Sequence, residues 1–230
     1  NLTAMHFLVL LLFLVVLFYG PSLWANRILK KYNNEQPGFP GTGSEFARHL
    51  IKQLNLQVSL EETDQGDHYD PVGKTVRLSA DHYHKKSLTA VVVAAHEVGH
   101  ALQDHLHYRP LTMRTQLAQV AYHAERVGAI FMYAIPIVAG VTRAPASGLV
   151  MFALGLATMG ISSVVHLVTL PVEFDASFKR ALPVLKAGNY LDQQDMRHAH
   201  SILLACALTY VAQSLSGLFN IWRWLTVFRR

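Results

Sequence analysis

The chain contains four long apolar stretches separated by polar ones. The first, residues 2–24, has no Asp, Glu, Lys or Arg, and the others cover residues 127–141, 148–170 and 202–222. A helix needs about 20 predominantly apolar residues to cross a bilayer. The pattern therefore predicts an N-terminal membrane anchor, two further spans, and a last segment that crosses the membrane or lies in its interface.

Between the first two apolar stretches, the pattern is typical of a small folded domain. Thr42 and Glu45 form a capping-box signature that opens a helix over residues 44–54, which has one apolar face. Two short strands follow at residues 56–60 and 74–79, with apolar and polar positions alternating in the second. We expect a short hairpin here, and its second strand could pair with the backbone of an extended peptide.

The next helix carries the motif on which the functional prediction depends, His96-Glu97-Val98-Gly99-His100. Ser87 can cap this helix, and the run before the motif is apolar on nearly all sides, so the helix should be buried. On a helix, His96 and His100 lie one turn apart on the same face, where both imidazoles can bind one zinc ion. Glu97 lies beside that position and can act as general base. Unpaired buried polar groups are costly, which argues against a chance match.

A zinc site with two histidines needs a third protein ligand. A metzincin would have glycine and a third histidine at set positions after the motif, where this chain has Gln103 and Leu106. Glu173 is a better candidate, because two predicted spans separate it from His100 and return both residues to the same side of the membrane. The other interpretation of Glu173 is a carboxylate stabilised by the N-terminus of a helix.

Further polar residues are candidates for roles around this site. His166 lies in a predicted span, where an ionisable group either lines a functional cavity or hydrogen-bonds to a neighbouring helix. Peptide hydrolysis needs a cationic or hydroxyl donor for the oxyanion, and we consider Arg197, His198 and Tyr210 for this role.

Composition and charge agree with a membrane protein. Hydrophobic residues make up 51% of the 230 residues, and the formal net charge is +5. Basic and acidic residues alternate without a basic stripe, so we expect no nucleic-acid partner. Basic residues directly after the first span place that end on the cytoplasmic side by the positive-inside rule. The single cysteine, Cys206, excludes an intrachain disulfide, and we expect it to pack in the last apolar segment.

Several linked motifs make the chain recognisable: they occupy residues 67–71, 76–79, 94–103 and 170–177. Together they resemble the YugP-like family of bacterial neutral zinc metallopeptidases of the membrane, along nearly the whole chain. The resemblance implies a zinc endopeptidase of the gluzincin kind, with His96, His100 and Glu173 as ligands of one zinc ion and Glu97 as base.

The arrangement is also similar to that of HtpX-type membrane proteases, in which an aspartate follows the third ligand by four residues. This chain has Ser177 at that position. A carboxylate commonly orients a ligand histidine, so Asp175 becomes the candidate for this task.

The predicted fold is mainly α-helical: a multi-span helical membrane protein with a small α+β zincin-like catalytic domain, in which a short β hairpin precedes the zinc helix. We expect five parts: an anchor at 1–25, a cytoplasmic zincin-like part at 26–126, two transmembrane helices at 127–170, a cytoplasmic helix with the third ligand at 171–201, and a transmembrane or interfacial helix at 202–230.

The predicted function is the hydrolysis of protein or peptide substrates by a multi-pass enzyme of the bacterial cytoplasmic membrane, with its active site facing the cytoplasm. Processing or quality control of membrane proteins is the expected role, with the lipid bilayer and other membrane proteins as partners. Two alternatives stay open: a non-catalytic membrane scaffold with a structural zinc site, and a metal transporter that depends on His166. Glu97 beside an open zinc position distinguishes the peptidase from both.

Overall fold

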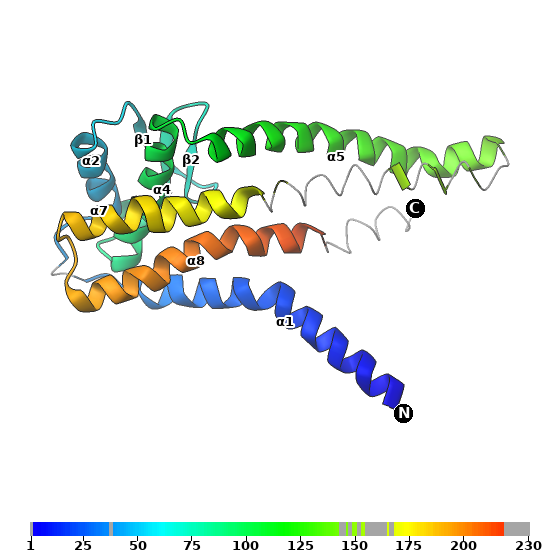
Figure 1. The fold of residues 1–230 in the computed structure, drawn as a ribbon, viewed down its shortest axis with the longest axis horizontal. Helices are drawn as coiled ribbons and strands as arrows, with labels where there is room; N and C mark the ends of the chain where they lie inside the picture. The colour runs from blue at the N-terminus through cyan, green and yellow to red at the C-terminus, as the bar shows by residue number, and fades with distance from the viewer. Residues whose placement is uncertain are drawn as a thin grey trace.

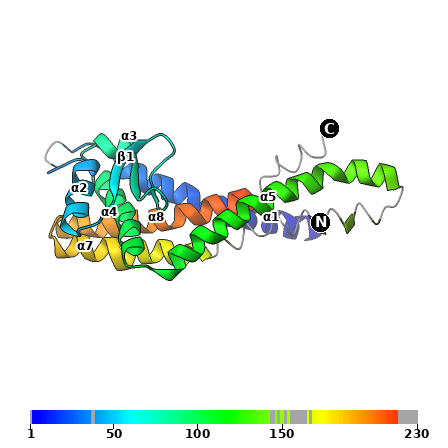
Figure 2. The same ribbon diagram turned by 90° about the horizontal axis from the view of Figure 1, so that it is seen from above.

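The computed structural model describes residues 2–36, 39–142, 146, 149–150, 153–154, 165 and 168–218. These residues form a mainly helical protein with one three-stranded sheet, where the sequence predicted a hairpin of two strands. The sheet and the shorter helices gather at one end of the molecule, and the long helices extend away from that end (Figures 1 and 2).

Helix α2 (Gly43–Gln53) begins at the predicted capping box. The backbone N–H of Glu45 donates to Thr42 Oγ1 at 3.2 Å, and the N–H of Thr42 donates to Glu45 Oε2 at 2.8 Å. Both groups would otherwise lack partners at the start of a helix. The apolar face of α2, which includes the buried Ala47 and Leu50, packs against α4.

The sheet consists of β1 (Ser59–Thr63), β2 (His68–Asp70) and β3 (Thr75–Ser79), in the order β1-β3-β2. β1 pairs with β3 in parallel, so the hairpin lies instead between β2 and β3, which are antiparallel. Asp70 closes that hairpin, because its Oδ1 accepts the backbone N–H groups of Val72 and Gly73. β3 is consequently paired on both sides, and the strand with a free edge near the motif is β2.

Helix α3 (Ala80–His84) leads into α4 (Leu88–His105), which carries the motif. Ser87 caps α4 as predicted, because its Oγ accepts the N–H of Ala90 at 3.1 Å. α4 is buried along nearly its whole length and contacts α2, α8 and the π-helix that follows Glu173. This central position explains why the run before the motif is apolar on nearly all sides.

The remaining elements are helices, and one of them is a π-helix. α5 (Arg109–Thr142) follows α4 directly, and residues 168–174 are helical and continue into the π-helix η1 (Asp175–Ala181) and α7 (Leu182–Ala187). α8 (Gln193–Leu218) then runs beside α1 (Leu2–Lys31), as both views show.

The multi-span part of the predicted fold is wrong. Among the residues that the structure describes, no helix is both long enough and apolar enough to cross a bilayer. The apolar stretches belong to longer helices that also contain polar turns: α5 begins at Arg109, α8 begins at Gln193, and α1 ends at Lys31. Most of the stretch at 148–170 lies outside the described residues. The multi-pass topology and the orientation deduced from the spans therefore lose their basis, while the division of the chain at residues 26, 127, 171 and 202 stays a prediction.

Candidate metal centre

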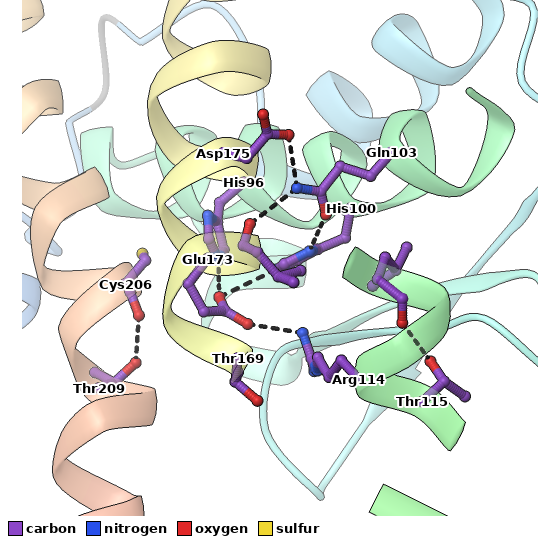
Figure 3. Close-up of polar contacts among 12 residues, drawn as sticks. His96, His100, Gln103, Arg114, Thr115, Thr169, Glu173, Asp175, Cys206 and Thr209 are labelled. Atoms are coloured by element: carbon purple, nitrogen blue, oxygen red, sulfur yellow. Dashed lines mark hydrogen bonds and ion pairs between the residues drawn. The ribbon is translucent and has the colours of Figure 1, made fainter. Parts of the chain in front are cut away.

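Two helices bring the three predicted metal ligands together. His96 and His100 lie one turn apart on α4, with 2% and 3% of their surface exposed, and Glu173 is fully buried in the helical segment 168–174. Glu173 Oε2 lies 3.2 Å from the Nε2 atom of each histidine. Figure 3 shows the carboxylate pointing at both rings. The three groups offer one ligand atom each, all within 4.8 Å of one another.

The protonation of the two imidazoles follows from their other ring nitrogens. Ser177 donates its hydroxyl proton to the carbonyl of Leu203 at 3.1 Å, so its Oγ accepts from His96 Nδ1 at 3.0 Å. Gln103 donates its amide N–H groups to the carbonyl of Val172 and to Asp175, so its Oε1 faces His100 Nδ1 at 2.9 Å. In each neutral ring, Nδ1 therefore holds the proton and Nε2 presents a lone pair.

Three acceptor atoms thus converge in a buried place. The Nε2 lone pairs of both histidines face a carboxylate oxygen of Glu173 at 3.2 Å. This arrangement is stable only if a cation binds among the three atoms, or if both buried rings are protonated to imidazolium. Zinc binds nitrogen and oxygen at about 2.0–2.1 Å, so the ligand atoms of a tetrahedral site lie about 3.3 Å apart. The separations from Glu173 fit that geometry, and two histidines with one carboxylate are a ligand set that zinc accepts.

The close approach of the two helices depends on Gly99 in the motif. A Cβ atom at position 99 would lie 2.8 Å from the carbonyl oxygen of Ala176 and 3.4 Å from Arg180 Cβ. Glycine lets the backbone of η1 come close enough for Glu173 to reach the histidines.

A π-helix begins two residues after Glu173. In η1, Arg180 Nε donates to Asp175 Oδ2 at 3.0 Å, a contact between residues five apart. Residues five apart do not share a face of an α-helix, whereas the wider π-turn brings them together. The same Oδ2 atom accepts from Gln103 at 2.8 Å. Asp175 therefore acts on His100 through Gln103 and not by direct contact, which refines the prediction made for it.

Glu97 borders a cavity of about 510 Å³ next to the ligand group. Its polar wall comes mainly from the segment around β2 and from α3, and its apolar wall from α1, α4 and α8. The ionisable side chains that line it include Asp67, His68, His82, Glu97 and Arg114. Burial raises the pKa of Glu97 to about 8 against an opposing effect of His96, and the nearby carboxylates add to the rise.

Arg114 and the hydrogen-bonded pair of Asp67 and His82 complete the surroundings of the cavity. Arg114, on the first turns of α5, donates from Nη1 to Glu173 Oε1 at 2.8 Å. Burial raises the pKa of Glu173, and without a bound cation only imidazolium forms of His100 and His96 would hold it well below its usual range. Asp67 accepts from His82 at 2.7 Å and from Ser79, and these bonds outweigh burial and lower the pKa of Asp67.

The structure separates two of the other sequence candidates, Arg197 and His198, from this cavity. Arg197 is exposed and lines a different hollow beside the turn between α7 and α8. His198 stacks on Tyr32 with ring centroids 4.6 Å apart. His166 and the side chain of Tyr210 lie outside the described residues.

Sequence reasoning missed Gln103, Arg114 and the Asp67–His82 pair. Gln103 could have been found, because it lies three residues after His100 on the same helix face. No local pattern in the sequence indicates a role for Arg114, because its place beside Glu173 depends on the direction in which α5 continues from α4.

A buried histidine pair on one helix, a carboxylate from a second helix and a further glutamate beside a cavity define the class of zinc metallopeptidases. The chain belongs to the family described as "Putative neutral zinc metallopeptidase", which matches residues 7–229. The family resemblance expected from the motifs is thereby confirmed.

One relative covers almost the same length. The protein named "Putative membrane protease YugP" of Bacillus subtilis (strain 168) is 33% identical over 231 residues, which include 95% of this chain and 96% of the relative. No solved structure matches the chain.

Proposed function

We propose that the protein is a zinc-dependent endopeptidase in which His96, His100 and Glu173 hold the metal and Glu97 is the general base. The observation that carries this proposal is the convergence of three buried acceptor atoms beside a cavity that Glu97 borders. Because those atoms repel one another without a cation, the arrangement favours metal binding over a set of ordinary polar contacts.

Glu97 has the position and the acidity for proton transfer. Bound zinc would lower the pKa of a water molecule and polarise the peptide carbonyl. Glu97 takes the proton as the water oxygen bonds to the carbonyl carbon, and then delivers it to the amide nitrogen as the C–N bond breaks, which leaves an acid and an amine. Burial raises the pKa of Glu97 to about 8, and a neighbouring divalent cation would lower it towards neutrality, where a group can both accept and release a proton.

An extended protein or peptide chain is the proposed substrate. β3 is paired on both sides and cannot accept it, but β2 is an edge strand, and residues 65–69 line the cavity. An edge strand can bind an extended backbone through main-chain hydrogen bonds. We place the substrate along β2, with its scissile bond between Glu97 and the metal ligands.

We further propose that the protein associates with a membrane and acts there in the processing or quality control of membrane proteins. The relative from Bacillus subtilis is named a membrane protease. α1 exposes a set of large apolar side chains with more than half of their surface accessible: Leu8, Val9, Leu12, Phe13 and Val16. Contiguous exposed apolar residues are typical of surfaces that bind lipid or protein.

Peptide cleavage by the zinc-loaded protein and its Glu97→Gln variant tests the mechanism. We expect Glu97→Gln to lower kcat by about 10²–10⁴-fold, the usual contribution of a general base, with an unchanged zinc content. Glu62→Gln, which alters an exposed carboxylate on β1, is the matched control and should cleave like the wild type.

Full cleavage by Glu97→Gln with one zinc per chain would refute the mechanism. If Glu97→Gln changes nothing and His96→Ala unfolds the domain, the zinc is structural and the non-catalytic scaffold is the better description.

A further inference from the structure

Peptide hydrolysis places a negative charge on the former carbonyl oxygen, and a fixed cationic or hydrogen-bonding group is needed to stabilise it. Of the candidates named from the sequence, Arg197 and His198 lie away from the cavity. Arg114 is the one arginine or lysine among the described residues that line the cavity. Arg114 is therefore the best-placed cationic side chain for stabilising the oxyanion.

Glu173 holds the Arg114 guanidinium beside the metal position. The two oxygens of the Glu173 carboxylate have separate partners: Oε2 lies 3.2 Å from both histidine nitrogens, and Oε1 accepts from Arg114 Nη1 at 2.8 Å. Only the Glu173 carboxylate therefore stands between the guanidinium and the two histidine ligand atoms. Figure 3 shows Arg114 approaching the Glu173 carboxylate from the side away from the helix that carries Glu173.

The chemistry of the side chain suits a developing oxyanion. A guanidinium is planar, keeps its charge at any relevant pH, and carries five N–H donors. The Arg114 side chain is 21% exposed, so it reaches the cavity while most of it is withdrawn from water. Electrostatic stabilisation is stronger in such a site than in bulk water.

We propose that Arg114 is a catalytic residue that stabilises the oxyanion of the tetrahedral intermediate, with Glu173 fixing its guanidinium in place. The inference rests on the proposed peptidase function and adds Arg114 to its catalytic residues.

His82 is the competing candidate, and its surroundings are less suitable. Its Nδ1 is paired with Asp67 at 2.7 Å, and Asp67 itself lines the cavity, where its negative charge would repel an oxyanion. Glu173, the partner of Arg114, is fully buried and does not line the cavity among the residues described there. Of Arg114 and Glu173, only Arg114 therefore lines the cavity.

The test compares Arg114→Met and Arg114→Lys with Arg109→Met, an exposed arginine at the start of the same helix. A phosphinic peptide, which carries a tetrahedral anion in place of the scissile bond, is titrated into each zinc-loaded protein by calorimetry. We expect Arg114→Met to weaken binding and lower kcat by about 10²–10³-fold, as loss of an oxyanion donor does, with KM changed far less. Arg114→Lys should recover part of both losses, and Arg109→Met should match the wild type.

A second measurement distinguishes charge stabilisation from support of the metal site. Arg114 also donates to Glu173, so Arg114→Met can lower zinc affinity, measured by competition with a chelator, by up to about 10–100-fold. At a zinc concentration that saturates the variant, its losses of kcat and of phosphinic-peptide binding should persist. Millimolar guanidinium should restore part of the activity of Arg114→Ala but not that of Glu97→Gln.

Two outcomes would overturn the assignment. Arg114→Met could bind the phosphinic peptide as tightly as the wild type, or it could lose zinc as readily as Glu173→Ala, which would make Arg114 a support for the ligand. A wild-type protein that binds zinc and the phosphinic peptide but cleaves no peptide would refute the proposed function, while the binding comparison would still decide the role of Arg114.

Discussion

At the scale of single residues, Gln103 links the two halves of the metal centre. It accepts from His100 Nδ1, and it donates to Val172 and Asp175 on either side of Glu173. It is fully buried, so all of these bonds are made away from water. One side chain therefore holds a ligand histidine in the tautomer that binds metal and ties it to the backbone that carries the third ligand.

Replacement of Gln103 by alanine should weaken zinc binding without removing a ligand. We expect zinc affinity to fall by about 10–100-fold, as it does when the partner of a ligand histidine is lost. Chelator competition measures this, and Gln194→Ala, an exposed position on α8, is the control. Unchanged zinc affinity in a folded Gln103→Ala protein would contradict the orienting role.

At the scale of elements, the site depends on the contact between α4 and η1. Gly99 has no Cβ to clash with the backbone of η1, and the π-helical turn places Asp175 and Arg180 on a common side, where Asp175 also accepts from Gln103. A π-turn inside a helix is rare and often found at functional sites. The helix that carries Glu173 thus also supplies Ser177, the partner of His96, and Asp175, which binds the His100 partner Gln103.

Gly99→Ala should destabilise the protein although alanine favours a helix. Alanine gains about 1 kcal/mol of helix propensity over glycine. The new Cβ would lie 2.8 Å from the carbonyl oxygen of Ala176, and such overpacking costs about 1–3 kcal/mol. We therefore expect a lower Tm and weaker zinc binding.

Gly140→Ala provides the matched control, because a Cβ at that position on α5 meets nothing within 4 Å. Thermal unfolding of both variants should show a lower Tm only for Gly99→Ala. Equal or higher stability of Gly99→Ala would mean that the two helices are not in close contact.

At the scale of the whole molecule, the proposed catalytic residues and the exposed apolar surface lie in different places. The metal centre lies at the end where the sheet, α2 and α4 gather, and the N-terminal turns of α1 extend away from that end (Figures 1 and 2). α1 is also connected to the active site, because Leu29 near its C-terminal end lines the cavity. One helix thus joins the proposed membrane contact to the proposed site of cleavage.

Replacement of Leu8, Leu12 and Phe13 by glutamine should weaken membrane association and leave peptide cleavage unchanged. Each side chain has more than half of its surface exposed, so its loss removes apolar area without opening a core. Flotation with vesicles of phosphatidylcholine and phosphatidylglycerol measures the bound fraction, with a triple glutamine variant of the exposed Glu35, Glu61 and Glu62 as control. Equal flotation of the apolar variant and the wild type would exclude α1 as the membrane contact.

Local patterns in the sequence were enough to predict the elements of the site. The capping box of α2, the Ser87 cap and the buried face of α4 depend on neighbours within four residues along the chain. The histidine pair needs only helical spacing. Glu173 was chosen because two predicted spans return it to the side of His100, a reason that was lost with the spans. The prediction of membrane spans was wrong, because no helix among the described residues is both long enough and apolar enough to cross a bilayer.

What the sequence by itself determined is therefore the kind of chemistry: two histidines and a glutamate on one helix, with a second glutamate as the missing ligand. Only the tertiary structure decided which groups surround them. Arg114 and Glu173 are 59 residues apart, Ser177 and His96 are 81 apart, and their contacts depend on how α5 and η1 pack against α4. No periodicity encodes such contacts, because they arise from the close approach of backbones at Gly99 and from the width of a π-turn.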